Sequence, residues 1–253
     1  MSGGARPGPL ALVGSGEFTH AMEDVDRGLL DGRPQRAVFL PTAAAPEGEA
    51  RLRYWVDLGE AHYRRLGVEP VPLRVRNRSD AEDHGLAAQV EGAGLVYLSG
   101  GNPAFLADTL RGSAVGQAIG RAWQAGAAVA GCSAGAMAMM DRVPHIRERD
   151  RTPTDGLGFV RGVVVLPHFD QMERWMSGAT ELALKLAPPG YRVLGIDEDT
   201  AVVGGPVEWR VAGRQSAWLL SVSGQHRRFG AGEVLQLDAH GEGSQAPEAP
   251  DGR

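Results

Sequence analysis

The 253-residue chain has a net charge of −5, with 43% hydrophobic and 23% charged residues, a balance typical of a globular protein that buries a sizeable core. This charge excludes an extended basic surface for nucleic acid or an anionic membrane, and no apolar window reaches the ~18 residues that a bilayer span requires. The single cysteine, Cys132, excludes an internal disulfide and a cysteine-based zinc site, and the N-terminus lacks the apolar stretch of a signal peptide, so we expect a cytoplasmic protein.

Short apolar runs alternate with longer amphipathic stretches in the first half of the chain, as is typical of βαβ units that build a parallel sheet. The apolar runs predict strands at 10–13, 37–40, 68–73, 95–98 and 127–130. Helices are predicted between them at 52–66, 80–90 and 103–125, the last broken near Gly112. We therefore predict an α/β fold, a flavodoxin-like three-layer sandwich with a mainly parallel sheet.

The last part of the chain begins with a polar segment at 141–158, which we predict to be a loop with the candidate role of a lid. Beyond it we predict one helix, at 171–186, and a series of short strands, at 162–166, 192–196, 200–203, 207–211, 217–222 and 234–237. The last three of these strands would form a small C-terminal antiparallel extension. We expect one domain at 9–239, with disordered tails at 1–8 and 240–253.

The pentapeptide Gly131-Cys132-Ser133-Ala134-Gly135 lies between an apolar strand and a second apolar run. Strand, sharp turn and helix form the context in which G-x-S-x-G exposes a serine as a nucleophile, and so tight a turn needs small flanking residues. The glycines flank position 133 symmetrically, so we predict that Ser133 occupies the turn and that Cys132 points back into the strand as a buried thiol. A serine nucleophile needs a base within hydrogen-bond reach, so the motif requires a histidine elsewhere.

Among the seven histidines, His168 stands directly after the end of a strongly apolar strand. In open α/β sheets the functional crevice lies beyond the carboxyl ends of the strands, where Ser133 is also expected, so we predict a Ser133–His168 pair. A third group, a carboxylate, must orient the imidazole. The residue pattern leaves four acidic residues open for this role: Asp170, Asp197, Glu198 and Asp199.

Two loops at predicted strand ends bear on the same site. The loop Ser99–Asn102 contains two glycines that let the backbone approach a ligand, so we predict that it supplies one N–H group to an oxyanion hole. The N–H group of Ala134, directly after the nucleophile, is the second predicted donor. The loop Gly14–Glu17 lacks the third glycine of a dinucleotide fingerprint, so we reject a Rossmann cofactor site.

Four motifs occur in order along the chain, at 98–102 (LSGGN), 131–136 (GCSAGA), 167–171 (PHFDQ) and 195–201 (GIDEDTA). Together they resemble the S51 peptidase family, which includes aspartyl dipeptidase (peptidase E) and cyanophycinase, and the likeness extends from the first strand to about residue 203. The resemblance implies a fold similar to class I glutamine amidotransferases. By position it also implies Ser133 as the nucleophile, His168 as the base and Glu198 as the acidic partner, with the N–H groups of Gly101 and Ala134 as oxyanion donors.

The chain departs from the cyanophycinase pattern around the predicted base. Cyanophycinase places Asp-Gln before the histidine and several arginines after it, whereas here Leu166-Pro167 precede His168, Met172 stands at the first arginine position and only Arg174 remains. This departure argues against cyanophycin as the substrate. The resemblance implies an aspartyl preference on the acyl side, and we expect Asn102 and Arg174 to bind substrate, Arg174 by pairing with a carboxylate.

We therefore predict a serine-type peptidase that hydrolyses a peptide or isopeptide amide through an acyl-enzyme and requires neither a metal nor an organic cofactor. Its expected partner is a small peptide substrate, with no nucleic acid or membrane partner, and the expected state is a monomer or homodimer. Two alternatives stay open. One is an α/β-hydrolase-type esterase that uses Ser133, Asp197 and His226, and the other is a catalytically silent amidotransferase-like module that binds a small acidic ligand or partner.

Overall fold

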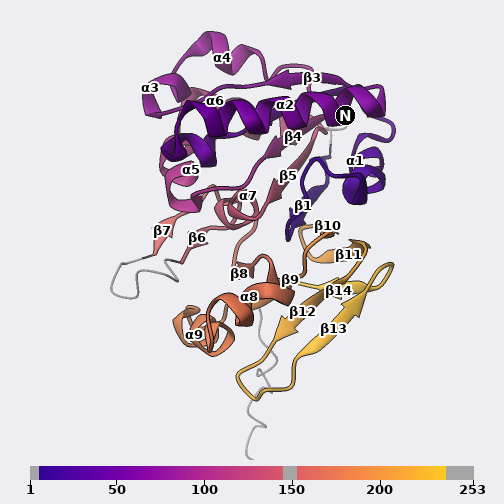
Figure 1. The fold of residues 1–253 in the computed structure, drawn as a ribbon, viewed down its shortest axis with the longest axis vertical. Helices are drawn as coiled ribbons and strands as arrows, with labels where there is room; N and C mark the ends of the chain where they lie inside the picture. The colour runs from indigo at the N-terminus through magenta and orange to yellow at the C-terminus, as the bar shows by residue number, and fades with distance from the viewer. Residues whose placement is uncertain (1–5, 145–152, 238–253) are drawn as a thin grey trace, which may run out of the picture.

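The computed structural model describes residues 6–144 and 153–237, and an eight-stranded sheet forms the upper part of the molecule in Figure 1. Five strands run parallel in the order β1-β5-β4-β2-β3, which requires crossover connections between them. These strands are β1 (Leu10–Val13), β2 (Arg36–Leu40), β3 (Glu69–Pro72), β4 (Leu95–Leu98) and β5 (Ala128–Cys132). Three antiparallel strands extend the sheet beyond β1: β10 (Thr200–Gly204), β11 (Glu208–Gly213) and β14 (Val234–Gln236).

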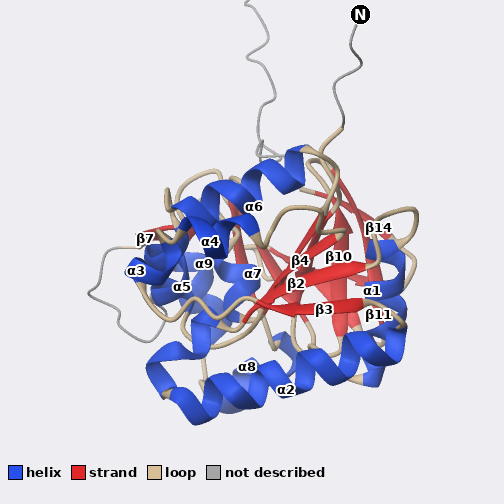
Figure 2. Ribbon diagram, turned by 90° about the horizontal axis from the view of Figure 1, so that it is seen from above, coloured by secondary structure: helices blue, strands red, loops and turns tan. Residues whose placement is uncertain are grey.

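Helices cover both faces of this large sheet, as Figure 2 shows. Side chains of a strand alternate between the two faces, so Val13 belongs to the core on one face and Leu12 to the core on the other. The helices that pack on the Val13 face are α1 (Glu23–Leu30) and α2 (Glu49–Leu66). The helices that pack on the Leu12 face are α3 (Arg78–Ala81), α4 (His84–Ala88), α5 (Pro103–Leu110), α6 (Ala114–Gln124) and α7 (Ala134–Ala138).

A second, four-stranded sheet lies below the first in Figure 1, in the order β13-β12-β9-β8. Its strands are β8 (Val163–Leu166), β9 (Arg192–Ile196), β12 (Ser216–Leu220) and β13 (Arg227–Gly230), with only the β8–β9 pair parallel. Two helices connect β8 to β9: α8 (Phe169–Trp175) and α9 (Ala179–Leu186). The apolar core on the Leu12 face continues into this smaller sheet through Val163, Val165 and Leu194, so the two sheets share one core.

The structure corrects several boundaries that the sequence predicted. The helix expected at 171–186 is divided, because Gly178 adopts φ +75° between α8 and α9, and the helix expected at 80–90 is divided into α3 and α4. The expected antiparallel extension is also divided, with β11 and β14 in the large sheet and β12 in the small one. Helix α1 and strand β13 were not predicted.

The predicted tails and the predicted lid are described only in part. Gly8, which was assigned to a disordered tail, exchanges two hydrogen bonds with Trp123, so the ordered chain begins before residue 9. Residues 1–5 and 240–253 lie outside the described residues, as do 145–152 of the predicted lid. The described ends of that segment form a short antiparallel pair, β6 (Arg142–Val143) with β7 (Thr154–Asp155).

Short elements and loops complete the described chain. Two 3₁₀ helices lie at His20–Met22 and Thr42–Glu47. Within the described residues no helix is both long and apolar enough to span a bilayer. The carboxyl ends of β1, β4 and β5 lie at one edge of the large sheet, because these strands are parallel neighbours, and the loops that follow them meet there.

Candidate active site

Ser133 occupies a sharp turn between β5 and α7. Its backbone adopts φ 51° and ψ −111°, a conformation that costs a non-glycine residue free energy and that recurs at functional sites. The flanking glycines are required by space, because a Cβ on Gly131 would lie 2.5 Å from the carbonyl carbon of Gly135, and a Cβ on Gly135 would lie 2.1 Å from the carbonyl oxygen of Leu98. Cys132 is fully buried on the Val13 face of the sheet, so the predicted orientation of this thiol is confirmed.

His168 follows β8 of the small sheet, and its imidazole contacts Ser133, which follows β5 of the large sheet. Its φ of 52° and ψ of 37° turn the chain sharply into α8. The Nε2 atom of His168 lies 3.0 Å from Oγ of Ser133, and its Nδ1 atom lies 2.8 Å from Oε1 of Glu198. The imidazole therefore links a hydroxyl and a carboxylate through its two ring nitrogens.

The acidic turn between β9 and β10 directs its three side chains to different neighbours. The carboxylate of Asp197 is buried and accepts hydrogen bonds from the N–H of Ser216 and from Nε1 of Trp218. Burial raises the pKa of Asp197 in spite of these hydrogen bonds. Asp199 adopts φ 52°, and its carboxylate lies 3.8 Å from the guanidinium of Arg214. Of the three carboxylates, that of Glu198 is the one that contacts the imidazole.

Asp170, the fourth acidic candidate, supports the backbone of Glu198 instead of the imidazole. Its Oδ1 atom accepts the N–H of Glu198 at 2.8 Å. The carbonyl oxygen of Glu198 accepts hydrogen bonds from Nε2 of Gln215 and Oγ1 of Thr200, both at 3.0 Å. Burial tends to raise the pKa of Asp170, but hydrogen bonds from the Glu198 N–H and the Gln171 and Gln215 amides hold it below the usual 3.8. The backbone on both sides of the Glu198 side chain is thus fixed.

The two N–H groups predicted to form an oxyanion hole are both free. Within the described residues, the N–H groups of Gly101 and Ala134 have no hydrogen-bond partner. Gly101 adopts φ +138°, and a Cβ there would lie 2.4 Å from the backbone of Ala43, so only glycine fits. Gly100 packs beside Ser133, since a Cβ on Gly100 would lie 3.5 Å from Cβ of Ser133. The loop and the turn therefore present two unbonded N–H donors near Ser133.

The two predicted substrate-binding residues lie at the start of α5 and on α8. The side chain of Asn102 caps α5 by accepting the N–H of Phe105 at 3.0 Å, which gives it a structural role. Arg174 is exposed on α8, with its guanidinium 3.2 Å from Oε1 of Gln171. Substrate binding by either residue stays a prediction.

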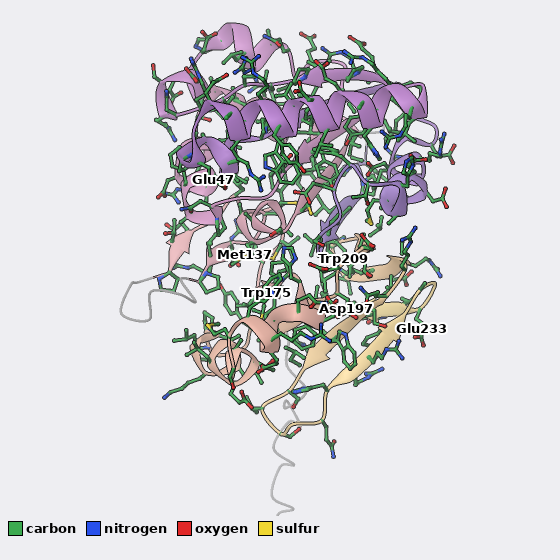
Figure 3. The ribbon with its side chains drawn as sticks, viewed as in Figure 1. Glu47, Met137, Trp175, Asp197, Trp209 and Glu233 are labelled. Atoms are coloured by element: carbon green, nitrogen blue, oxygen red, sulfur yellow. The ribbon has the colours of Figure 1, made fainter. Side chains whose placement is uncertain are left out.

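The sequence did not single out Trp175, which lies one residue beyond Arg174 on α8. Its ring centroid lies 5.3 Å from that of His168, and the side chain is 63% exposed. In Figure 3 the labels of Met137, Trp175 and Asp197 mark the region between the large and the small sheet. A large exposed aromatic side chain beside the imidazole gives this region an apolar surface that a ligand can contact.

The structure does not bring together the residues of the alternative esterase site. His226 is exposed in the connection between β12 and β13, where its Nδ1 accepts the N–H of Ser221. None of the hydrogen bonds of the described residues joins His226 to Ser133 or Asp197. Nor does any group of three or more His, Cys, Asp or Glu side chains in the described ranges have an arrangement that could hold a metal ion.

A hydroxyl, an imidazole and a carboxylate joined in this order are the arrangement found in serine hydrolases. The comparisons with known proteins agree with this class. The model of peptidase family S51 matches residues 10–205, most of the chain. The protein belongs to peptidase family S51, and it is a peptidase of the serine hydrolase class.

Related proteins and structures support this assignment. A crystal structure of a peptidase from an acI-B1 Actinobacterium superposes with a TM-score of 0.84 and 36% identity, covering 92% of this chain and 98% of that one. A putative peptidase E from Listeria monocytogenes EGD-e shares the fold, with a TM-score of 0.63 and 18% identity over 83% of this chain and 100% of that one. The uncharacterized peptidase Lin0382 of Listeria innocua is 29% identical over 141 residues, which span 53% of this chain and 64% of that relative. The predicted α/β fold with a largely parallel central sheet is thereby confirmed.

Proposed function

We propose that this protein hydrolyses a peptide or isopeptide amide through an acyl-enzyme, with Ser133 as nucleophile, His168 as general base and acid, and Glu198 as the orienting carboxylate. The observation that carries this proposal is the bridging imidazole, with Nε2 at 3.0 Å from the Ser133 hydroxyl and Nδ1 at 2.8 Å from the Glu198 carboxylate. Both distances lie in the range in which a base activates a serine and is itself oriented.

In the proposed first step, Oγ of Ser133 attacks the carbonyl carbon of the substrate while Nε2 of His168 removes the hydroxyl proton. The carbonyl oxygen becomes an oxyanion, which the free N–H groups of Gly101 and Ala134 stabilise. The imidazolium then donates its proton to the leaving amine, the C–N bond breaks and an ester to Ser133 remains. A water molecule, deprotonated by His168, hydrolyses this ester and releases the acid. Glu198 stabilises the imidazolium in both steps by accepting the hydrogen bond from Nδ1.

We further propose that the substrate is a small peptide with an aspartyl residue, α- or β-linked, on the acyl side of the cleaved bond. The support is the family membership together with the exposed guanidinium of Arg174, whose fork of donors matches a carboxylate. The catalytic cluster draws its residues from loops at strand ends, the position where α/β folds bind small ligands.

A fluorophosphonate probe tests the proposed chemistry because it labels activated serines. The wild-type protein is expected to be labelled on the peptide that contains Ser133, and Ser133→Ala is expected to remain unlabelled. A dipeptide library that includes α- and β-linked aspartyl peptides then tests the proposed substrate. A folded wild-type protein that no fluorophosphonate labels would favour the catalytically silent binding module. Labelling with no hydrolysis of aspartyl peptides, but with hydrolysis of others, would refute only the proposed acyl-side preference.

A further inference from the structure

Glu17 is a buried carboxylate in the loop Gly14–Glu17, which follows β1. It is 7% exposed, and no ion pair within the described ranges includes it. Burying a carboxylate without a cationic partner is costly unless hydrogen bonds satisfy its oxygens. Both oxygens are satisfied here, since Oε1 accepts the N–H of Gly100 at 3.0 Å and Oε2 accepts the thiol of Cys132 at 2.8 Å.

The contact with Gly100 lies in the loop that carries the free N–H group of Gly101. On one side of Gly101, the N–H of Gly100 is bound by Glu17, and on the other side the N–H of Asn102 donates to the carbonyl oxygen of Ala43 at 2.8 Å. The N–H of Gly101 is thus an unbonded donor between two N–H groups that are hydrogen-bonded. Space is tight as well, since a Cβ on Gly100 would lie 2.9 Å from Oε1 of Glu17.

The contact with Cys132 joins the same carboxylate to the residue directly before the nucleophile. Cys132 ends β5, and the N–H of Ser133 donates to the carbonyl oxygen of Val13 on β1 at 2.9 Å. Burial, and next the nearby carboxylate of Glu17, raise the pKa of the Cys132 thiol, so the thiol keeps its proton and remains a donor. Glu17 therefore contacts the loop after β4, which carries one predicted oxyanion donor, and the last residue of β5, which precedes the turn that carries the other.

We propose that Glu17 is a positioning residue that holds the Gly100–Gly101 loop in register with Ser133, so that the N–H of Gly101 points at the developing oxyanion. This inference rests on the proposed function, because it assigns a support to the same oxyanion hole. Losing one oxyanion donor costs about 10²- to 10³-fold in kcat in a serine hydrolase, and a shift of about 1 Å in a positioned group costs up to about 10²-fold. Removing the acceptor of the Gly100 N–H is therefore expected to slow the reaction by about 10- to 100-fold.

The test compares Glu17→Met and Glu17→Gln with the wild type, using a fluorophosphonate as the probe. Methionine keeps the volume and removes the acceptor, whereas the glutamine carbonyl can still accept the Gly100 N–H. Asp26→Asn is the matched control, because Asp26 is another buried carboxylate, on helix α1, and it bonds to His62 at 2.7 Å instead of to the oxyanion loop. We would measure, for each protein, the maximal labelling rate (kinact), the half-saturating concentration (KI) and the unfolding temperature. If Glu17→Met does not fold, Glu17→Ala replaces it.

The expected result is that Glu17→Met lowers kinact by about 10- to 100-fold with KI within about threefold, and that Glu17→Gln stays within about threefold of wild type. Asp26→Asn should lower the unfolding temperature and leave kinact within about threefold. Wild-type kinact in folded Glu17→Met, or an equal loss in Glu17→Gln, would overturn the positioning role while leaving the proposed function intact. An equal loss in Asp26→Asn would also overturn it. Failure of the wild type itself to be labelled at Ser133 would overturn both.

Discussion

Replacing Glu198 by glutamine tests the orienting carboxylate, because it changes one charge and leaves the size of the side chain almost unchanged. In the proposed mechanism the carboxylate accepts the hydrogen bond from Nδ1 of His168, so that Nε2 is the nitrogen that accepts the proton of Ser133. A glutamine amide cannot compensate the charge of the imidazolium. Its NH₂ group can also donate to Nδ1, and that arrangement places the ring proton on the wrong nitrogen.

The size of the effect follows from the environment of the pair. The side chains of His168 and Glu198 are 26% and 35% exposed, so water partly screens their attraction. Two unit charges about 4 Å apart attract by roughly 4 kcal/mol at an effective dielectric constant of about 20, and by roughly 2 kcal/mol at about 40. At about 1.4 kcal/mol for each factor of ten in rate, Glu198→Gln should lower kcat by roughly 30- to 1,000-fold. This loss is smaller than the ~10⁴-fold loss for a buried triad aspartate converted to asparagine.

The assay is kcat on the best dipeptide of the library, measured across pH for Glu198→Gln, Asp199→Asn and wild type. Thermal unfolding of each variant shows that the protein is folded. Asp199→Asn is the matched control, since its carboxylate faces Arg214 and not the imidazole, and kcat should stay within about threefold of wild type. The reasoning is refuted if Glu198→Gln retains wild-type kcat while Asp170→Asn loses it, because the orienting carboxylate would then be that of Asp170, two residues after His168.

Three further predictions follow from the same geometry. Ser133→Ala should lower kcat by about 10⁴- to 10⁶-fold. Cys132→Ser keeps a hydrogen-bond donor to Glu17 and should lower kcat by less than about tenfold. Equal losses in both variants would contradict the assignment of Ser133 as the nucleophile. His168→Ala should be as damaging as Ser133→Ala in kcat/KM, while His226→Ala should be nearly silent, and the reverse pattern would favour the esterase alternative. Burial acts to raise the pKa of Asp170, but hydrogen bonds outweigh this effect and keep the pKa below 3.8. The ionised Asp170 therefore stabilises the folded protein above pH 3.8, and this stabilisation is lost as the pH falls through the lowered pKa of the folded state. Asp170→Asn should therefore flatten the acid-side decrease of the unfolding temperature, and an unchanged decrease would contradict this.

The central parallel strands β1, β4 and β5 were predictable because each is buried on both faces and so consists almost entirely of apolar residues, as the run Leu95–Leu98 shows. Strand β13 lacked this signal, since Phe229 is its single buried residue and pairing with β12 holds it in place. The division into two sheets was also beyond sequence reasoning. Which strands become neighbours is decided by long-range packing, and the local pattern of β8 resembles that of a strand in the large sheet.

The sequence was sufficient to predict that the candidate site lies beyond the carboxyl ends of the strands. Ser133 and His168 were found from glycine spacing and from the rule that functional groups follow the carboxyl ends of strands. Glu198 could be chosen over its neighbours only by family resemblance. The direction in which each side chain of the three-residue acidic turn points depends on tertiary contacts, such as that of Asp197 with Trp218. Glu17 was missed although it also follows a strand end, since a buried acid without a basic partner leaves no pattern in the sequence.

The hydrogen bond between Ser133 and His168 connects the two sheets at the candidate site. Ser133 belongs to the large sheet, and His168 follows β8 of the small one, whereas Glu198 lies in the turn where the chain passes from β9 of the small sheet to β10 of the large one. Helix α7 packs on β8 within the apolar core that the two sheets share, and the rigidity of this core determines the distance between Ser133 and His168. Four non-glycine residues of the described chain adopt positive φ, and Ser133, His168 and Asp199 are three of them, at an expected cost of about 1–3 kcal/mol each. Such strain persists only where the surrounding packing determines the backbone, so the shared core between the sheets is what allows three strained loops to meet at one imidazole.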